Sequence, residues 1–323
     1  MAERPNVLVT SAARKVPLVR AFRRASRKVG GGKVLAGDVS SLAAALYAAD
    51  AGVLLPRSDD PGFVEHLLAL CQRERVGLVI PTRDAELPVF ARAATRFAES
   101  GTLVLVSPPD AVELCQDKRA FIGAVAAAGL ATPRVVDEPG PSDFPVFVKA
   151  RRGAGARGAG PAADAAALAS LRVDLGADAV VQELVDAPEH TIDAFLDLDG
   201  IAISAVPRER IQVVAGESVV TRTVADAALA DAATRLCTSI GLIGHVTLQA
   251  FRSPDRIAFI EINPRYGGAA NLGFEAGAPT PEWAIRLARG ERLEPRLGDY
   301  EVGLTMLRAA DDHFVRDAEL LRP

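Results

Sequence analysis

Short apolar, β-branched runs alternate with amphipathic stretches through the first third of the chain. The runs lie at residues 7–10, 34–37, 53–55, 78–81 and 103–106. In the intervening stretch 61–74, apolar side chains recur every three or four positions, as on the buried face of a helix. Strands that alternate with helices usually form a parallel sheet, because each crossover helix returns the chain to the end of the sheet where the previous strand began. We therefore predict an α/β, parallel-sheet domain over residues 1–108.

The pattern changes after Ser107-Pro108-Pro109-Asp110, where the two prolines interrupt the alternation. A helix is expected over 111–128, with Asp110 as its N-cap. Three prolines then punctuate a loop before compact apolar strands at 146–149 and 180–183. We predict that residues 109–186 form a small subdomain together with this leading helix.

The remaining pattern is typical of an α+β subdomain over 187–323. Expected strands at 190–197, 201–206 and 211–214 look antiparallel, and a helix is expected over 225–240. A hairpin follows, with arms at 245–252 and 256–263 joined by the turn Ser253-Pro254-Asp255. The tail from residue 311 onward carries no motif.

Composition narrows the class of protein. Of the 323 residues, 49% are hydrophobic and 24% are charged, which is typical of a folded globular protein of two or three units. The net charge of -4 comes from interspersed acidic and basic residues, so neither nucleic acid nor an anionic membrane is an expected partner. The three cysteines lie far apart without metal-binding neighbours and are expected to be buried free thiols in a reducing cytoplasm.

A basic, glycine-rich segment follows the strand at 146–149. It runs from Lys149 through Gly153, Gly155 and Gly158 and contains three arginines, a composition that suits phosphate. The glycines also match G-x-G-x-x-G, but the motif is crowded by arginine, and Pro161 separates it from the next helix, which disfavours a dinucleotide site. The Walker pattern fails because no Gly-Lys-Ser/Thr follows. A hinged lid over a nucleotide is the favoured interpretation, and a plain exposed loop is the alternative.

Polar residues gather on the late hairpin. Glu261 and Asn263 are two apart in the second arm and so project from one face, while Gln249 lies in the first arm. Oxygen ligands of this kind suit magnesium, which shares its coordination sphere with water and nucleotide phosphates. Arg265 follows at once and would offset the charge of a transferred phosphoryl group. Solvent-facing polar positions are the alternative interpretation.

In order along the chain, four segments resemble motifs of the ATP-grasp superfamily, particularly its carbamoyl-phosphate-synthetase-like branch. They are Asp117-Lys118, Val148-Lys149 with its glycine loop, Val181-Gln182-Glu183-Leu184, and Glu261-Ile262-Asn263-Pro264-Arg265. The last is the most specific. The start, Val7 to Ala12, resembles the pre-ATP-grasp domain of the same enzymes. The resemblance spans most of the chain and implies a Rossmann-like domain, a lid subdomain and a C-terminal antiparallel-sheet subdomain.

The resemblance also implies nucleotide contacts. Lys118 and Lys149 would contact ATP phosphates, and the loop with Gly153, Gly155 and Gly158 would close over them. The segment Gln182, Glu183 and Leu184 would hold adenine. Glu189 would take the ribose hydroxyls, although Ala187 departs from the glycine often found nearby.

The remaining implied roles concern metal and phosphoryl transfer. Gln249, Glu261 and Asn263 match magnesium ligands, with manganese as an alternative ion, and Arg265 would lie beside the transferred phosphoryl group. Arg208 and Arg210 resemble basic residues that bind the acyl substrate or γ-phosphate. Surface salt bridges to Glu209 and Glu217 are the competing explanation for these two arginines.

The resulting hypothesis is an ATP- and magnesium-dependent ligase that joins a small-molecule carboxylate to an amine through an acyl phosphate and releases ADP and phosphate. The alternatives are a small-molecule kinase and a non-catalytic nucleotide-binding regulatory module. His190, His245, Asp84 and Glu86 are expected to make structural hydrogen bonds. A homodimer is one arrangement that the sequence allows.

Overall fold

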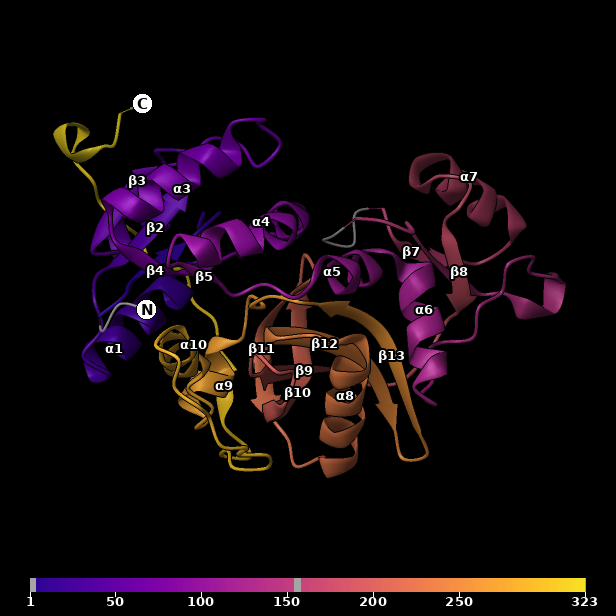
Figure 1. Ribbon diagram of the computed structural model, residues 1–323. Helices are drawn as coiled ribbons and strands as arrows, with labels where there is room; N and C mark the ends of the chain where they lie inside the picture. The colour runs from indigo at the N-terminus through magenta and orange to yellow at the C-terminus, as the bar shows by residue number, and fades with distance from the viewer. Residues whose placement is uncertain (1–3, 154–157, 323) are drawn as a thin grey trace.

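The computed structural model describes residues 4–153 and 158–322 and contains three sheets. A parallel sheet forms one end of the molecule, a small three-stranded sheet forms the other, and a six-stranded antiparallel sheet lies between them (Figure 1). The predicted combination of α/β and α+β parts is confirmed.

The first sheet has the order β3-β2-β1-β4-β5, and every neighbouring pair is parallel. Its strands are β1 (Asn6–Val9), β2 (Val34–Asp38), β3 (Ala51–Leu54), β4 (Val76–Ile80) and β5 (Leu103–Val104). The crossover helices are α1 (Val16–Lys28), α2 (Ala44–Ala48), α3 (Phe63–Arg73) and α4 (Leu87–Glu99). Strand order reverses between β1 and β4, and in sheets of this kind ligands bind beyond the carboxyl ends of the strands at such a reversal.

Two apolar layers cover this sheet. On one face Phe63, Phe90 and Phe97 of α3 and α4 form a buried cluster with edge-to-face and tilted ring contacts. On the other face α1 packs against α10 (Thr280–Ala288), which comes from near the other end of the chain. Trp283 of α10 belongs to the same buried cluster as Phe22 of α1. The C-terminal part of the chain therefore completes the core around the parallel sheet.

The predicted helix over 111–128 is wrong in one respect, because two helices occupy this range. They are α5 (Pro109–Gln116) and α6 (Lys118–Ala127), and Asp117 between them has extended backbone. Its carboxylate accepts hydrogen bonds from the amides of Arg119 and Ala120 and thereby caps α6. Asp110 lies in the first turn of α5 and does not cap it.

The small sheet has the order β7-β6-β8 and is antiparallel. Its elements are β6 (Val146–Lys149), β7 (Gly160–Ala162), α7 (Ala165–Leu175) and β8 (Val180–Glu183). Strand β7 was not predicted. Among the described residues, six form its buried core, and Leu168 is the one buried residue of α7.

The antiparallel sheet has the order β13-β12-β9-β10-β11-β14. Its strands are β9 (Glu189–Leu196), β10 (Ala202–Val214), β11 (Glu217–Thr223), β12 (Gly244–Ser253), β13 (Arg256–Asn263) and β14 (Thr305–Leu307). Helix α8 (Ala227–Ile240) packs on it, and α9 (Asn271–Glu275) follows the hairpin. The strands expected at 201–206 and 211–214 are one strand, since pairing with β9 continues through Pro207 and Arg208.

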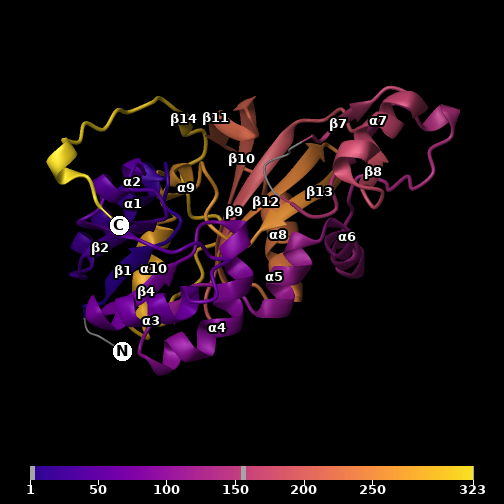
Figure 2. The same cartoon turned by 90° about the horizontal axis from the view of Figure 1, so that it is seen from above.

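After β14 the chain returns to the parallel-sheet end of the molecule (Figure 2). Arg20 pairs with Asp311 at 2.7 Å, and the amide of Leu321 donates to the Tyr47 hydroxyl. Short 3-10 turns occur at Asp84–Glu86, Pro141–Asp143 and Asp317–Glu319. The three cysteines are buried and unpaired, as predicted. In the described part of the chain, no helix has the length and apolar character required to cross a bilayer.

Candidate active site

The predicted hairpin cluster forms where β12 and β13 pair. Gln249 lies directly opposite Glu261, and the Asn263 amide donates to Glu261 Oε1 at 3.0 Å. Only one orientation of the Gln249 amide satisfies its neighbours. In that orientation Nε2 lies 3.2 Å from both Glu189 Oε1 and Glu261 Oε1, and Oε1 accepts from Arg210 Nη1 at 2.7 Å. Glu261 is therefore in contact with Asn263 on the same strand and with Gln249 on the paired strand.

Glu189 and Arg210 extend this cluster along β9 and β10. Arg210 Nε lies 3.3 Å from Glu189 Oε1, and the Arg210 side chain is 6% exposed. Burial raises the pKa of Glu189 and Glu261 adds to the rise, while Arg210 opposes it. Burial likewise lowers the pKa of Arg210. The Arg210 side chain is buried while Glu189 keeps 29% of its side chain exposed, so the two charges are partly shielded from water and a cation or phosphate bound beside them would be screened less than at an exposed surface.

Two lysines lie near Glu261. Lys149, at the end of β6, is 7% exposed, and its ammonium donates to the Ile260 carbonyl at 3.0 Å. Burial lowers the pKa of Lys149 to about 8, with Lys118 adding to the fall and Glu261 opposing it. Burial also lowers the pKa of Lys118, again against the attraction of Glu261. Lys118, Lys149 and Glu261 thus lie close enough to influence one another.

The glycine-rich segment is attached to the start of α6. Arg151 and Arg152 pair with Asp117 Oδ2 at 2.7 and 3.0 Å, and Lys118 donates to the Gly153 carbonyl. Gly153 and Gly158 have positive φ, a conformation that favours glycine. Gly155 lies outside the described residues.

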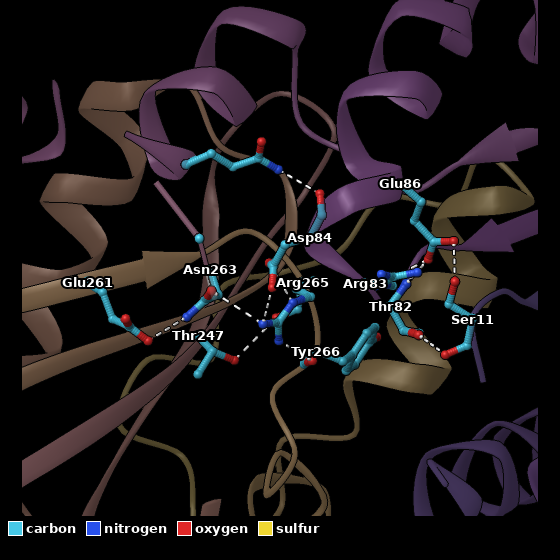
Figure 3. Close-up of polar contacts among 12 residues, drawn as sticks. Ser11, Thr82, Arg83, Asp84, Glu86, Thr247, Glu261, Asn263, Arg265 and Tyr266 are labelled. Atoms are coloured by element: carbon cyan, nitrogen blue, oxygen red, sulfur yellow. Dashed lines mark hydrogen bonds and ion pairs between the residues drawn. The ribbon is translucent and has the colours of Figure 1, made fainter. Parts of the chain in front are cut away.

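Arg265 connects the hairpin to the parallel-sheet domain (Figure 3). Its Nε and Nη2 donate to the two carboxylate oxygens of Asp84, each at 2.7 Å, and Nη2 also reaches Asn263 Oδ1 at 3.3 Å. Asp84 follows β4, at the point where the strand order reverses. We expected only a structural hydrogen bond from Asp84, and nothing in the local sequence indicated Arg265 as its partner.

Glu86 fixes the loop that carries Asp84. It is 1% exposed and accepts hydrogen bonds from Thr10 Oγ1, Ser11 Oγ and the backbone amide of Thr82, at 2.7 to 2.9 Å. Burial raises its pKa, against the effect of these donors. The expected structural role of Glu86 is therefore observed, and it joins the loops after β1 and β4.

Arg208 has partners that the sequence did not indicate. Its Nε donates to Asp193 at 2.7 Å, and each of the two side chains is 3% exposed. Asp193 also accepts from Thr247, and its Oδ1 lies 3.4 Å from His245 Nε2. The suggested partners Glu209 and Glu217 instead pair with Arg222 and Arg308. Arg208 is therefore buried against Asp193, away from solvent, whereas Arg210 contacts the hairpin cluster.

The segment expected to hold adenine lies at the end of β8. Gln182 is 2% exposed and donates to the Pro133 carbonyl, and Glu183 accepts from the Arg134 amide and from Arg256. Leu184 is 44% exposed. Gln182 is therefore buried, whereas the side chains of Glu183, at 26% exposure, and Leu184 remain accessible to a ligand.

The donor set fits magnesium better than a soft metal. No three His, Cys, Asp or Glu side chains cluster at metal-binding distance within the described residues. The candidate ligands are the Glu261 carboxylate and the amide oxygens of Asn263 and Gln249, with the Glu189 carboxylate adjacent. In this structure the two amide oxygens accept from Arg265 and Arg210, so the two amide groups would have to turn to present oxygen to an ion beside Glu261. Magnesium accepts few protein oxygens and completes its shell with water and phosphate, so such a sparse oxygen site suits it.

Two protein-family models match the chain. Residues 7–105 match the PylC-like N-terminal domain, and residues 176–307 match ATP-grasp in the biosynthetic pathway with Ter operon. The carbamoyl phosphate synthase large chain of Acidobacterium capsulatum is 26% identical over 265 residues, which cover 72% of this chain. The chain spans only 24% of that relative's length.

Solved structures share the fold. Biotin carboxylase from Campylobacter jejuni superposes with a TM-score of 0.73 at 18% identity, covering 94% of this chain and 74% of that one. N5-carboxyaminoimidazole synthetase from Staphylococcus aureus, complexed with ADP, gives a TM-score of 0.70 at 17% identity, covering 90% and 79%. The architecture expected from the sequence motifs is thereby confirmed.

Proposed function

Because the chain belongs to the ATP-grasp superfamily, we propose that it is an ATP- and magnesium-dependent ligase that joins a small-molecule carboxylate to an amine. One observation carries the proposal. Glu261 is linked through Asn263 to Arg265 on one side and through Gln249 to Arg210 on the other. Phosphoryl transfer needs this combination of a metal-binding carboxylate and flanking permanent cations.

Each part of the site has a proposed ligand. Lys118 and Lys149 bind the ATP phosphates beneath the segment that contains Gly153 and Gly158, and Leu184 contacts adenine beside the backbone of β8. Glu189 is adjacent to the metal ligands and is proposed to receive the ribose hydroxyls. Glu261, Asn263 and Gln249 hold magnesium, or manganese in its place. When bound, the metal neutralises charge on the phosphate oxygens.

The proposed reaction has two steps. A carboxylate oxygen of the substrate attacks the γ-phosphorus, and the bond to the β-phosphate oxygen breaks. This step yields ADP and an acyl phosphate. The amine then attacks the acyl carbon, phosphate departs, and the amine loses a proton. Arg265 and Arg210 stabilise negative charge on the transferred group, and most of the rate enhancement comes from positioning.

The test is incubation with ATP, magnesium and a panel of amino acids and small carboxylates. We expect substrate-dependent release of ADP and phosphate, with a condensed product found by mass spectrometry. AMP and pyrophosphate would contradict the acyl phosphate route. A phosphorylated product that persists in the presence of amines would favour a kinase, and nucleotide binding without turnover would favour a regulatory module.

A further inference from the structure

Asp84 and Arg265 form an ion pair between two distant parts of the chain. They are 181 residues apart, and two hydrogen bonds of 2.7 Å join the edge of the guanidinium to both carboxylate oxygens. The side chains are only 22% and 18% exposed. A bidentate pair of this kind fixes the plane of the guanidinium as well as its position.

One of the remaining contacts of Arg265 reaches the hairpin cluster, and the other is to the backbone of the next residue. Nη2 reaches Asn263 Oδ1 at 3.3 Å, and Nη1 donates to the Tyr266 carbonyl at 3.2 Å. Thr247 donates to the Arg265 carbonyl and so fixes its backbone. Asp84 is the only carboxylate among the described residues within ion-pair distance of this guanidinium. The orientation of Arg265 relative to Asn263 and Glu261 therefore depends on Asp84.

Asp84 is itself held firmly. Its carbonyl accepts from Gln116 Nε2 at 2.6 Å. Glu86 in the same short turn accepts hydrogen bonds from Thr10 and Ser11 after β1, and Figure 3 shows its contact with Ser11. The carboxylate is thus carried on a short turn that is anchored to the loop after β1 and to α5. A rigid support is what a positioning group requires.

We propose that Asp84 is a positioning residue that holds Arg265 in the orientation needed to stabilise the transferred phosphoryl group. The inference rests on the proposed function and deepens it, because it assigns the parallel-sheet domain a part in the phosphoryl-transfer step. The competing explanation is that the pair only stabilises the contact between the two parts of the chain.

The test compares binding of MgADP with binding of MgADP plus aluminium fluoride, which imitates the phosphoryl group during transfer and needs no substrate. In Asp84→Asn we expect the affinity for the aluminium fluoride complex to fall about 100-fold, as for a misplaced catalytic group, while MgADP affinity changes less than about twofold. The matched control is Asp59→Asn. Asp59 makes an equivalent bidentate pair with Arg57 on the exposed surface of the same domain, and neither affinity should change.

Two further variants separate positioning from simple stabilisation. In an Arg265→Lys background, Asp84→Asn should cause no additional loss, because the two residues act as one unit. Asp84→Glu keeps the charge but moves the carboxylate, so it should show the same selective loss even if Asp84→Asn folds poorly. The positioning role would be overturned if both Asp84 variants kept the wild-type ratio of the two affinities, either because neither affinity changed or because both fell equally. Failure of the wild-type protein to bind MgADP would overturn the proposed function as well.

Discussion

At the scale of single residues, we predict that Lys149 makes nucleotide binding depend on pH. Its ammonium is buried, and its pKa in the folded protein is about 8, below the usual value of 10.5. Phosphate oxygens close to Lys149 would favour the charged form and raise this pKa again. Above pH 8, binding must therefore be accompanied by proton uptake, and affinity should fall as the pH rises through this value.

Calorimetry of MgATP binding at pH 8.5, in buffers of different ionisation enthalpy, measures that uptake directly. We expect it to approach one proton per nucleotide in the wild-type protein. Lys149→Arg keeps its charge throughout the range, so it should show no uptake even if its affinity is lower. Equal proton uptake in both proteins would show that another group titrates.

Glu261 provides the one carboxylate among the three predicted metal ligands, so its charge should matter more for magnesium binding than its shape. Glu261→Gln keeps the size of the side chain, and we expect the magnesium concentration for half-maximal turnover to rise about 10- to 100-fold, with the melting temperature unchanged. Magnesium titration of ADP release and a circular dichroism melt measure the two quantities. Glu275→Gln is the control, since Glu275 makes only an exposed pair with Arg24. Wild-type magnesium dependence in Glu261→Gln would contradict the assignment.

The sequence predicted some of these residues and not others for a physical reason. Alternation along a strand places Glu261 and Asn263 on one face, and pairing within a hairpin brings Gln249 to them. Alternation also places Arg208 and Arg210 on the same face of β10. It could not reveal that Arg208 pairs with Asp193 on β9. Nor could it reveal the pair of Asp84 with Arg265, which depends on how two remote elements pack.

At the scale of elements, Asp117 joins helix α6 to the glycine-rich segment. It caps the helix, and it pairs with Arg151 and Arg152 while its side chain is 4% exposed. The hydrogen bond from Arg151 lowers the pKa of Asp117. The stabilisation is therefore complete above the usual aspartate pKa and is lost as the pH falls through the lower, folded-state value.

We expect Asp117→Ala to lower the free energy of unfolding by about 2 kcal/mol, of which about 1 is the lost cap and the rest the two ion pairs. Nucleotide affinity should fall too, because Lys118 begins the same helix. Urea unfolding and MgADP titration measure these effects. Asp164→Ala removes a cap from α7 without an ion pair, so it should cost only about 1 kcal/mol and leave affinity intact. Equal affinities in the two variants would contradict the role given to Asp117.

Elements were predicted well where the pattern is local. The strands and helices of the parallel sheet follow from apolar periodicity, and the sheet is confirmed. The break at Asp117 was missed because it is stabilised by arginines 34 and 35 residues away. Strands β7 (Gly-Pro-Ala) and β14 (Thr-Met-Leu) were missed because neither contains valine or isoleucine, whereas the even shorter β5 lies in the apolar, β-branched run 103–106.

At the scale of the whole molecule, buried apolar contacts unite most of the chain. One cluster contains Phe22 beneath the parallel sheet, Phe195 of the antiparallel sheet and Trp283 of α10. The ring centroids of Phe195 and Trp283 are 5.7 Å apart. These two sheets should therefore unfold together. The sheet β7-β6-β8 has its own small core and does not share this cluster.

The difference in core size predicts where the molecule opens first. Regions with few buried contacts open at low free energy, so amides of α7 should exchange with solvent faster than those of α8, which buries six residues. Lys149 is the last residue of β6, the central strand of this sheet, and its ammonium already contacts β13. We therefore expect MgATP bound at Lys149 to hold the small sheet against β13 and to slow exchange in β6 and α7. Hydrogen exchange followed by mass spectrometry, with and without a non-hydrolysable MgATP analogue, measures both effects.

Helix α3 lies on the far side of the parallel sheet and serves as the internal control, since its exchange should not change. Slower exchange in α3 as well would indicate general stabilisation, and no change in β6 would mean that this sheet does not close on the nucleotide.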